Sequence, residues 1–455
     1  MQVILLSGGS GKRLWPLSND ARSKQFLKVI LSENNKLESM LQRVYKQLKS
    51  VNLHNKTSLA TSKAQVEMIH KQIGDEVNVI AEPCRRDTFP AIALAATYLY
   101  TEKNISEDEV VAVLPVDPYV EDAFFEKIKN LENVVFKSEA DLALIGIKPT
   151  YPSEKYGYIV PEEENEDAYK RVVKFTEKPN ERLAKELIEQ KALWNSGVFA
   201  FRLGYIISLL KEKGYPTTYR QLLKDYEKLE KISFDYAVVE KANKIVVTSF
   251  NSYWKDLGTW NTLTEEMAIN KIGEGRISES SINTHVINEL NIPVSVLGIK
   301  DAIVAASPDG ILVASKEESP KIKELMSGHE AIPMYEERYW GSYKILDYST
   351  FTNHQVITRH LKINEGKNLS YQYHKYRTEN WTIIKGEGII IIDDKMQVVR
   401  SGDAIQIKEY QKHAIKALQD LEIIEVQQGI NLIEEDINRI NDNWEEVEKN
   451  CFNKI

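Results

Sequence analysis

Between residue 1 and about residue 265, short runs of β-branched residues alternate with stretches of helical periodicity. Such alternation predicts an α/β fold with a mostly parallel sheet, because each crossover lays a helix on a face of the sheet. Around Leu37–Leu48 the apolar residues recur every three or four positions, which is the period of a half-buried helix. The expected strands are Val3–Leu6, Ser58–Ala60, Val77–Ile80, Val110–Leu114 and Leu142–Ile147.

The pattern changes beyond residue 265. From about Ile277 to Val313, short apolar runs are separated by Asn, Pro, Gly and Asp, which favours a small β module, and Lys316–Met326 then predicts a charged connecting helix. Alternating strands return after residue 332 and predict an all-β barrel or sandwich. The expected domains are therefore 1–265, 266–332 and 333–455. The strands expected in the last domain are Val356–Ile363, Trp381–Ile384, Gly388–Ile392, Ala404–Ile407 and Ile423–Val426.

Composition excludes several classes of protein. The chain has 59 Lys and Arg residues and 67 Asp and Glu residues, and the resulting net charge of −8 disfavours nonspecific binding to nucleic acid or membrane surfaces. No apolar run approaches the roughly 20 residues that a membrane helix needs. The N-terminus lacks the pattern of a signal peptide, and the two cysteines, Cys84 and Cys451, are too few for a disulfide framework. We therefore expect a cytoplasmic protein in which any anionic ligand meets a local basic pocket.

A glycine-rich loop, Ser7–Leu14, follows the first expected strand. Its glycines would let backbone N–H groups approach a phosphate closely. The loop lacks the spacing of a Walker loop, and Leu14 stands where a dinucleotide fingerprint has its third glycine. Arg22 and Lys24 follow shortly afterwards, so four cationic side chains gather near this loop in an acidic chain. A phosphate-rich ligand is the expected occupant.

The loop and four later segments resemble the sugar-nucleotide pyrophosphorylases, and specifically the mannose-1-phosphate guanylyltransferases. The matching segments are Glu82–Ala93, Phe175–Pro179, Trp194–Phe199 and Trp254–Trp260. The resemblance implies a Rossmann-like nucleotide-diphospho-sugar transferase fold with a mixed sheet. It also implies the formation of GDP-mannose and pyrophosphate from GTP and mannose 1-phosphate. An oxygen of the sugar phosphate is already anionic, so this reaction requires charge neutralisation and positioning rather than a general base.

The resemblance also assigns residues to roles. Arg13 and Lys24 would hold the triphosphate and the leaving group, Lys178 would hold the sugar phosphate, and these three are the expected catalytic residues. Asp117 and Asp256 would bind magnesium; Asp117 ends an apolar strand, where α/β sheets place ligand sites. The expected nucleotide-binding residues are Leu6, Gly8, Gly9, Gly11, Lys12, Glu82 and Arg86. The expected sugar-binding residues are Gly157, Glu177 and Asn195.

Two departures from the family pattern lie near these sites. Pro118-Tyr119 follows Asp117 where the family usually has His, and Asp87–Pro90 replaces the family's Asn-Thr-Ala-Pro. Another hexose 1-phosphate or another base therefore stays open as the substrate. A rival of a different class is a sugar-phosphate sensor that binds ligands without turnover, although a sensor would not need two metal-binding carboxylates.

Metal-ligand types cluster in the last third of the chain. Gln372 and His374 are expected on one face of a strand, Glu379 returns on the next strand, and His413 lies eleven residues after Gly402. Two imidazoles, one carboxylate and one amide suit zinc or another first-row divalent ion.

This region resembles the cupins, and specifically the type II mannose-6-phosphate isomerase domain that is fused to guanylyltransferases. The matching segments are Trp340–Tyr343, Gln372–Trp381, Glu425–Gly429 and Glu435–Arg439. The resemblance implies a cupin barrel with a divalent metal, in which Arg377 and Arg439 contact a phosphate or an enediolate. Departures at 375–376, 408–410 and 444–446 leave an active isomerase and a structural or regulatory cupin both open. The expected partners are GTP and a hexose 1-phosphate, with a second copy of the chain as a further candidate.

Overall fold

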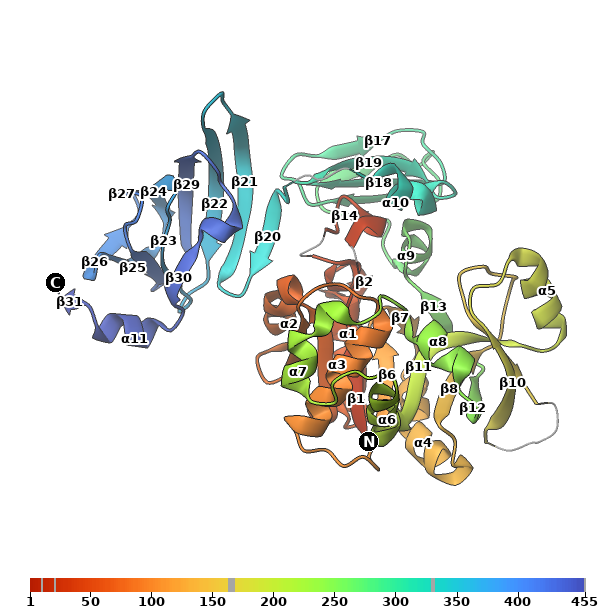
Figure 1. The fold of residues 1–455 in the computed structure, drawn as a ribbon. Coiled ribbons are helices and arrows are strands. Elements are labelled where there is room, and N and C mark those ends of the chain that lie inside the picture. The colour runs from red at the N-terminus through yellow and green to blue at the C-terminus, as the bar shows by residue number, and fades with distance from the viewer. Residues whose placement is uncertain (10, 20–21, 163–167, 329–331, 454–455) are drawn as a thin grey trace. The chain divides into compact units, whose positions relative to one another are not determined.

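Figure 1 shows the computed structural model of the protein, which describes residues 1–455 except 10, 20–21, 163–167, 329–331 and 454–455. Ser10 of the glycine-rich loop therefore lies outside the described residues. The chain forms two compact units. The first unit comprises Met1–Asn270, Asp301–Ile303 and Ala314–Leu325, and the second comprises Lys271–Lys300, Val304–Val313 and Met326–Ile455. The division into three domains at residues 265 and 332 stays a prediction.

A nine-stranded sheet with the order β5-β4-β1-β6-β11-β8-β12-β10-β9 forms the centre of the first unit (Figure 1). It contains all five strands that the sequence predicts. The sheet is mixed, because β11 runs antiparallel to both β6 and β8, whereas β1 is parallel to β4 and β6. The bounds are β1 Gln2–Leu6, β4 Thr57–Ser62, β5 Asn78–Glu82, β6 Val110–Pro115, β8 Leu142–Ile147, β9 Tyr158–Pro161, β10 Lys170–Thr176, β11 Leu193–Arg202 and β12 Ile245–Phe250.

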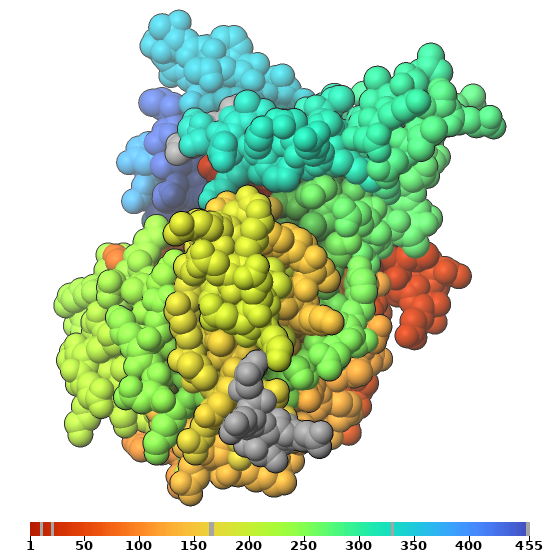
Figure 2. All heavy atoms as spheres, turned by 90° about the vertical axis from the view of Figure 1, so that its right-hand side faces the viewer, coloured from red at the N-terminus to blue at the C-terminus, as the bar shows by residue number. Residues whose placement is uncertain are grey.

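Helices cover both faces of this sheet. Strand β8 is buried along its whole length, as expected for a strand with helices on either side. Helix α3 (Thr88–Thr101) is almost entirely apolar and lies in the main core, whereas α5 (Glu181–Glu189) buries only Ala184 and Leu187 and faces the viewer in Figure 2. The other helices are α1 Met40–Ser50, α2 Val66–Ile73, α4 Ala123–Ser138, α6 Leu203–Glu212, α7 Tyr219–Lys224, α8 Phe234–Ala237, α9 Trp260–Glu266 and α10 Ile322–Leu325.

Two expected helices have different bounds in the structure. The first begins at Met40 rather than Leu37, because Ser39 caps it: the Ser39 hydroxyl accepts from the Gln42 N–H, and the Gln42 side chain accepts from the Ser39 N–H. Leu37–Glu38 instead forms strand β3 and pairs with β2 (Ile30–Leu31). The expected connecting helix at 316–326 is limited to the 3-10 turn Ser319–Lys321 and the short α10.

The rest of the chain is mostly β-structure. Two six-stranded sheets, β20-β21-β22-β29-β24-β27 and β30-β23-β28-β25-β26-β31, form the cupin barrel around the apolar core that includes Trp381 and Ile423. No helix in the described residues is long and apolar enough to cross a membrane. The barrel strands are β20 Tyr335–Arg338, β21 Gly341–Thr350, β22 Gln355–Ile363, β23 Tyr371–Tyr373, β24 Arg377–Lys385, β25 Glu387–Ile392, β26 Lys395–Arg400, β27 Ala404–Ile407, β28 His413–Ala417, β29 Leu421–Gly429, β30 Asn438–Asn441 and β31 Phe452–Asn453.

Short strands precede the barrel, as the sequence predicts for residues 277–313. They form a four-stranded sheet, β14-β16-β18-β19, and a two-stranded sheet, β15-β17. Their bounds are β14 Lys271–Ile272, β15 Gly275–Ile277, β16 His285–Asn288, β17 Val294–Val296, β18 Ala302–Ser307 and β19 Gly310–Ser315.

Candidate functional site

Two cavities lie at the carboxyl ends of the parallel strands in the first unit. The larger has a volume of about 330 Å³ and the smaller about 200 Å³, and both are lined by Leu6, Thr88, Pro115 and Asp117. Leu6 ends β1 and Pro115 ends β6, so the cavities occupy the edge at which open α/β sheets bind ligands. The larger cavity is lined by residues predicted to bind the nucleotide and its phosphates: Leu6, Gly8, Gly9, Lys24, Glu82 and Arg86. The smaller cavity is lined by the residues predicted to bind the sugar: Gly157, Glu177 and Asn195.

Lys24 lies between the two predicted magnesium ligands. Its Nζ atom is 2.6 Å from Asp117 Oδ2 and 3.7 Å from Asp256 Oδ1. Asp256 reaches this position because β13 (Trp254–Asp256) pairs with β7 (Pro118–Val120), which follows Asp117 directly. Burial by itself raises the pKa of Asp117, but the Lys24 ammonium outweighs it and lowers that pKa below its usual value. Burial, together with the Asp117 charge, raises the pKa of Asp256.

These two carboxylates fit a divalent cation. Within the described residues, the buried Asp256 Oδ1 accepts no hydrogen bond. Two neighbouring carboxylates, one of them with this buried oxygen, supply the oxygen ligands that a hard divalent cation prefers.

The glycine-rich loop is held against the same end of the sheet. The Ser23 hydroxyl donates to the Gly9 carbonyl at 3.1 Å, and the Trp260 indole N–H donates to the Trp15 carbonyl at 3.2 Å. Gly9 has φ +131°, a backbone conformation that residues other than glycine rarely adopt. Three other predicted residues, Lys12, Arg13 and Lys178, have described side chains and do not line either cavity, whereas the surroundings of Gly11 lie outside the described part of the chain. Arg13 is nevertheless close enough for its charge to lower the pKa of Asp117.

Glu82 ends β5 and lies in the wall of the larger cavity. The Tyr226 hydroxyl donates to Glu82 Oε2 at 2.6 Å. Arg86 is held by a hydrogen bond from its guanidinium to the Leu229 carbonyl at 3.0 Å. Sequence analysis identified Glu82 and Arg86 but missed Tyr226, because no local spacing links residues 144 positions apart.

Asp235 is a second residue that sequence analysis missed. It lies in the first turn of the short helix α8 and lines the smaller cavity, where the Asn195 amide donates to its Oδ1 at 2.8 Å. Burial and the neighbouring Glu177 charge raise the pKa of Asp235 to about 7. Lys178 forms an ion pair with Glu177 beside this cavity. A Cβ atom on Gly157 would lie 2.5 Å from Glu177 Oε2, so only glycine fits there without displacement.

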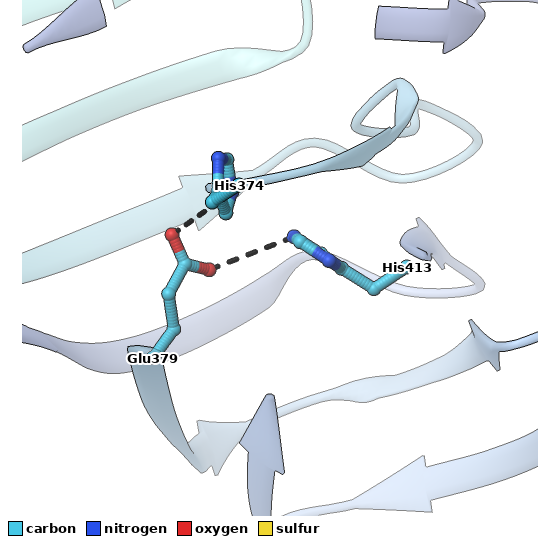
Figure 3. Close-up of side chains that lie close together, drawn as sticks. All are labelled: His374, Glu379 and His413. Carbon is cyan, nitrogen blue, oxygen red and sulfur yellow. Dashed lines mark ion pairs between the residues drawn. The ribbon is translucent and has the colours of Figure 1, made fainter. Parts of the chain in front are cut away.

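The barrel interior brings together three of the four predicted cupin ligands. His374 follows β23, Glu379 lies in β24 and His413 begins β28, and Figure 3 shows one Glu379 oxygen directed to each imidazole. His374 Nε2 is 3.2 Å from Glu379 Oε1, and His413 Nε2 is 3.6 Å from Glu379 Oε2. All three side chains are buried, and their ligand atoms lie within 4.8 Å of one another.

The surroundings of these imidazoles fit a metal ion. His374 Nδ1 donates to the Asp436 carbonyl and His413 Nδ1 donates to the Gln411 carbonyl, so each ring turns its Nε2 toward Glu379. His374 Nε2 also lies 3.4 Å from Arg377 Nη2. In the described part of the chain, the buried His413 Nε2 has no hydrogen-bond partner. Burial lowers the pKa of His413, which favours the neutral ring that metals bind.

The remaining predicted cupin residues are Arg377, Gln372 and Arg439, and they differ in burial and in hydrogen-bond partners. Arg377 is buried, and its Nε donates to Glu379 Oε1 at 3.1 Å, so it supports the carboxylate directly. Gln372 is paired in register with both His413 and Arg439, which places the three side chains on one face of the sheet. The Gln372 amide oxygen accepts a hydrogen bond from Ser370, and Arg439 is exposed.

Comparisons with known proteins cover both units. Residues 2–271 match the family described as nucleotidyl transferase, and residues 327–442 match the family described as mannose-6-phosphate isomerase C-terminal. The chain is 30% identical to a mannose-1-phosphate guanylyltransferase of Salmonella montevideo, with 97% of this chain and 98% of that protein covered. It is 29% identical to the alginate biosynthesis protein AlgA of Pseudomonas aeruginosa, with 97% and 96% covered.

A solved structure supports the fold of the first unit. The crystal structure described as mannose-1-phosphate geranyltransferase from Thermus thermophilus superposes with a TM-score of 0.61 at 29% identity, and covers 72% of this chain and 99% of that chain. The chain therefore belongs to the nucleotidyl transferase family, and it shares the two-part architecture of mannose-1-phosphate guanylyltransferases that end in a mannose-6-phosphate isomerase-type cupin domain.

Proposed function

We propose that the protein forms GDP-mannose and pyrophosphate from GTP and mannose 1-phosphate in the cytoplasm, as a protein that acts independently of nucleic acid and membranes. The observation that carries this proposal is the position of Lys24, Asp117 and Asp256 where the two cavities meet. The similarity to a guanylyltransferase over 97% of the chain supports the same reaction. We further propose the three-domain division at residues 265 and 332, and a homodimer as the assembly.

The proposed reaction joins the contents of the two cavities. An oxygen of mannose 1-phosphate attacks the α-phosphorus of GTP, the bond between that phosphorus and the bridging oxygen breaks, and pyrophosphate leaves in line. Arg13 and Lys24 neutralise the triphosphate, and Lys178 holds the sugar phosphate as a point charge. Glu177, Asn195 and Asp235 offer acceptors and donors to the sugar hydroxyls from the smaller cavity. Orientation and charge neutralisation carry the reaction because its nucleophile is already ionised.

Asp117 and Asp256 would hold the magnesium ion. The chemistry that bound magnesium supplies is the compensation of phosphate charge. Lys24 occupies the space between the two carboxylates, so its ammonium has to turn toward the phosphates when nucleotide binds.

The test is pyrophosphate release from GTP, ATP, CTP and UTP, each combined with mannose, glucose, fucose and fructose 1-phosphates in the presence of magnesium. Release confined to GTP with mannose 1-phosphate is the expected result. Release with another pair would retain the reaction and change the substrate. If no pair releases pyrophosphate while ligands still bind, the protein is a sensor and the proposal fails.

A second activity is favoured by the barrel interior. His374, Glu379 and His413 would hold zinc or another divalent ion, with Gln372 as a fourth ligand. Polarisation of a carbonyl oxygen is the chemistry that such a metal supplies to the interconversion of mannose 6-phosphate and fructose 6-phosphate. Arg377 holds Glu379 in place through the hydrogen bond from its Nε, and Arg439 is placed on the same face as Gln372 for a phosphate group. Incubation with mannose 6-phosphate tests this activity, and a metal-loaded protein that forms no fructose 6-phosphate would leave the cupin a structural or regulatory role.

A further inference from the structure

Tyr226 and Glu82 form a buried pair in the wall of the larger cavity. Glu82 is 8% exposed and Tyr226 is fully buried, and the phenol donates to Glu82 Oε2 at 2.6 Å. Glu82 ends strand β5, whereas Tyr226 begins the 3-10 turn Tyr226–Lys228. The proposed phosphoryl transfer uses neither side chain directly, so we looked for a role of this pair in nucleotide binding.

The phenol restrains the orientation of this carboxylate and opposes the effect of burial on its pKa. Burial raises the pKa of Glu82, and the hydrogen bond from Tyr226 opposes that rise. Arg85 also lowers the pKa of Glu82, and Asp87 raises it. Because Tyr226 binds one lone pair of Oε2, the plane of the carboxylate is restrained, and Oε1 together with the other lone pair of Oε2 can accept from a ligand in the cavity that Glu82 lines.

A restrained carboxylate distinguishes one nucleobase from the others. Guanine presents two adjacent donors, N1–H and the N2 amino group, and a carboxylate accepts both. Adenine presents an acceptor at N1, which a carboxylate repels. Inosine keeps N1–H but lacks the amino group, so it forms only part of the contact.

We propose that Tyr226 is the positioning residue that holds Glu82 for the recognition of guanine. This inference rests on the proposed use of GTP and adds the residue that determines base specificity. The segment that carries Tyr226 is anchored independently of the phenol: the Phe89 N–H donates to the Ile232 carbonyl at 3.2 Å, and the Phe234 N–H donates to the Thr88 hydroxyl at 2.8 Å. Removal of the hydroxyl should therefore leave the backbone in place.

The experiment compares GTP and ITP as substrates of wild type and Tyr226→Phe, with mannose 1-phosphate saturating. Wild type should prefer GTP by at least about tenfold in kcat/KM, as expected when a buried polar group loses its partner. Tyr226→Phe should reduce this preference about fivefold or more, mainly through a higher KM for GTP. As pH falls, the KM for GTP should also begin to rise at a higher pH in the variant than in wild type, because loss of the Tyr226 hydrogen bond raises the pKa of Glu82.

Tyr158→Phe is the matched control. Its phenol is equally buried and donates to the Ser153 carbonyl, outside the residues that line the larger cavity. This control should keep the wild-type preference for GTP. Circular dichroism checks that both variants are folded, and Glu82→Gln provides a second approach: Tyr226→Phe should cause no further change in that background, because Tyr226 acts through Glu82.

Several outcomes separate this inference from the proposed function. An unchanged GTP to ITP ratio in Tyr226→Phe would overturn the inference, as would additive effects of the two substitutions or a wild type that uses GTP and ITP equally well. A preference for ATP, CTP or UTP over GTP, or no turnover with any nucleotide, would instead overturn the proposed function. Equilibrium binding of GTP and ITP to the same variants gives the same ratio without turnover.

Discussion

The Asp235 carboxyl is close to half-protonated at neutral pH, because burial and the Glu177 charge raise its pKa from 3.8 to about 7. The unfolded chain releases this proton near its ordinary pKa, so between about pH 4 and pH 7 the folded state binds more protons than the unfolded state. The free energy of unfolding should therefore fall as pH rises through this window, by at most about 1.4 kcal/mol per pH unit from this group.

Urea unfolding of wild type and Asp235→Asn between pH 4 and pH 8 measures this effect. The stability of wild type relative to the variant should decline as pH rises, since asparagine does not titrate. Parallel profiles would mean that the folded structure does not raise the pKa of Asp235.

Lys178 is the residue expected to bind the sugar phosphate. Lys178→Ala should raise the KM for mannose 1-phosphate about 10- to 100-fold, which corresponds to the loss of a hydrogen bond between charged groups. The KM for GTP should change by less than about threefold. Lys174→Ala is the control, because Lys174 is exposed on β10 and does not line either cavity. A larger change for GTP than for mannose 1-phosphate would move Lys178 to the nucleotide.

At the scale of elements, Gly157 lets the chain that enters β9 lie close to β11 and to Glu177. Its carbonyl accepts from the Asn195 N–H at 2.8 Å, and an added methyl group would meet Glu177 Oε2. Gly157→Ala should displace Glu177 and raise the KM for mannose 1-phosphate at least about tenfold, with little change in GTP binding or in the circular dichroism spectrum. Unaltered kinetics for mannose 1-phosphate would exclude Glu177 from the sugar site.

The local sequence also determines where a secondary-structure element begins. Helix α1 begins where Ser39 caps it, and Leu37–Glu38 forms a strand although Leu37 continues the helical stripe. A period of three to four therefore located the helix, whereas a side-chain hydrogen bond set its first residue. Antiparallel β11 was harder to predict, because alternation of strands and helices favours parallel neighbours.

At the scale of the whole molecule, two separate units carry the two candidate sites. Replacement of both His374 and His413 by Ala should remove the metal from the barrel, because only Glu379 would remain of the buried triad. Nucleotidyl transfer should stay within about twofold of wild type, because its residues lie in the other unit. Elemental analysis and pyrophosphate release measure the two effects. Undiminished zinc in the double variant would contradict the ligand assignment, and lost pyrophosphate release would show that the units depend on each other.

The sequence by itself determined the α/β and all-β character of the two regions and most strand positions. It also determined the family resemblance, and the comparisons confirm that resemblance. These features depend on patterns within a few residues, where periodicity, glycine and turn chemistry act directly. It also predicted that His374, Glu379 and His413 act together, and the structure brings them close although Glu379 belongs to one sheet of the barrel, and His413 and the strand that His374 follows belong to the other.

Only the tertiary structure decided that Tyr226 binds Glu82 and that Asn195 binds Asp235. In the nine-stranded sheet, most neighbouring strands are not consecutive along the chain, and Tyr226 and Asp235 reach the cavities from segments far from Glu82 and Asn195 in the sequence. Burial then sets the charge of each group, as the raised pKa of Asp235 shows. No local spacing encodes such contacts, because they depend on how remote segments pack and on how much water that packing excludes.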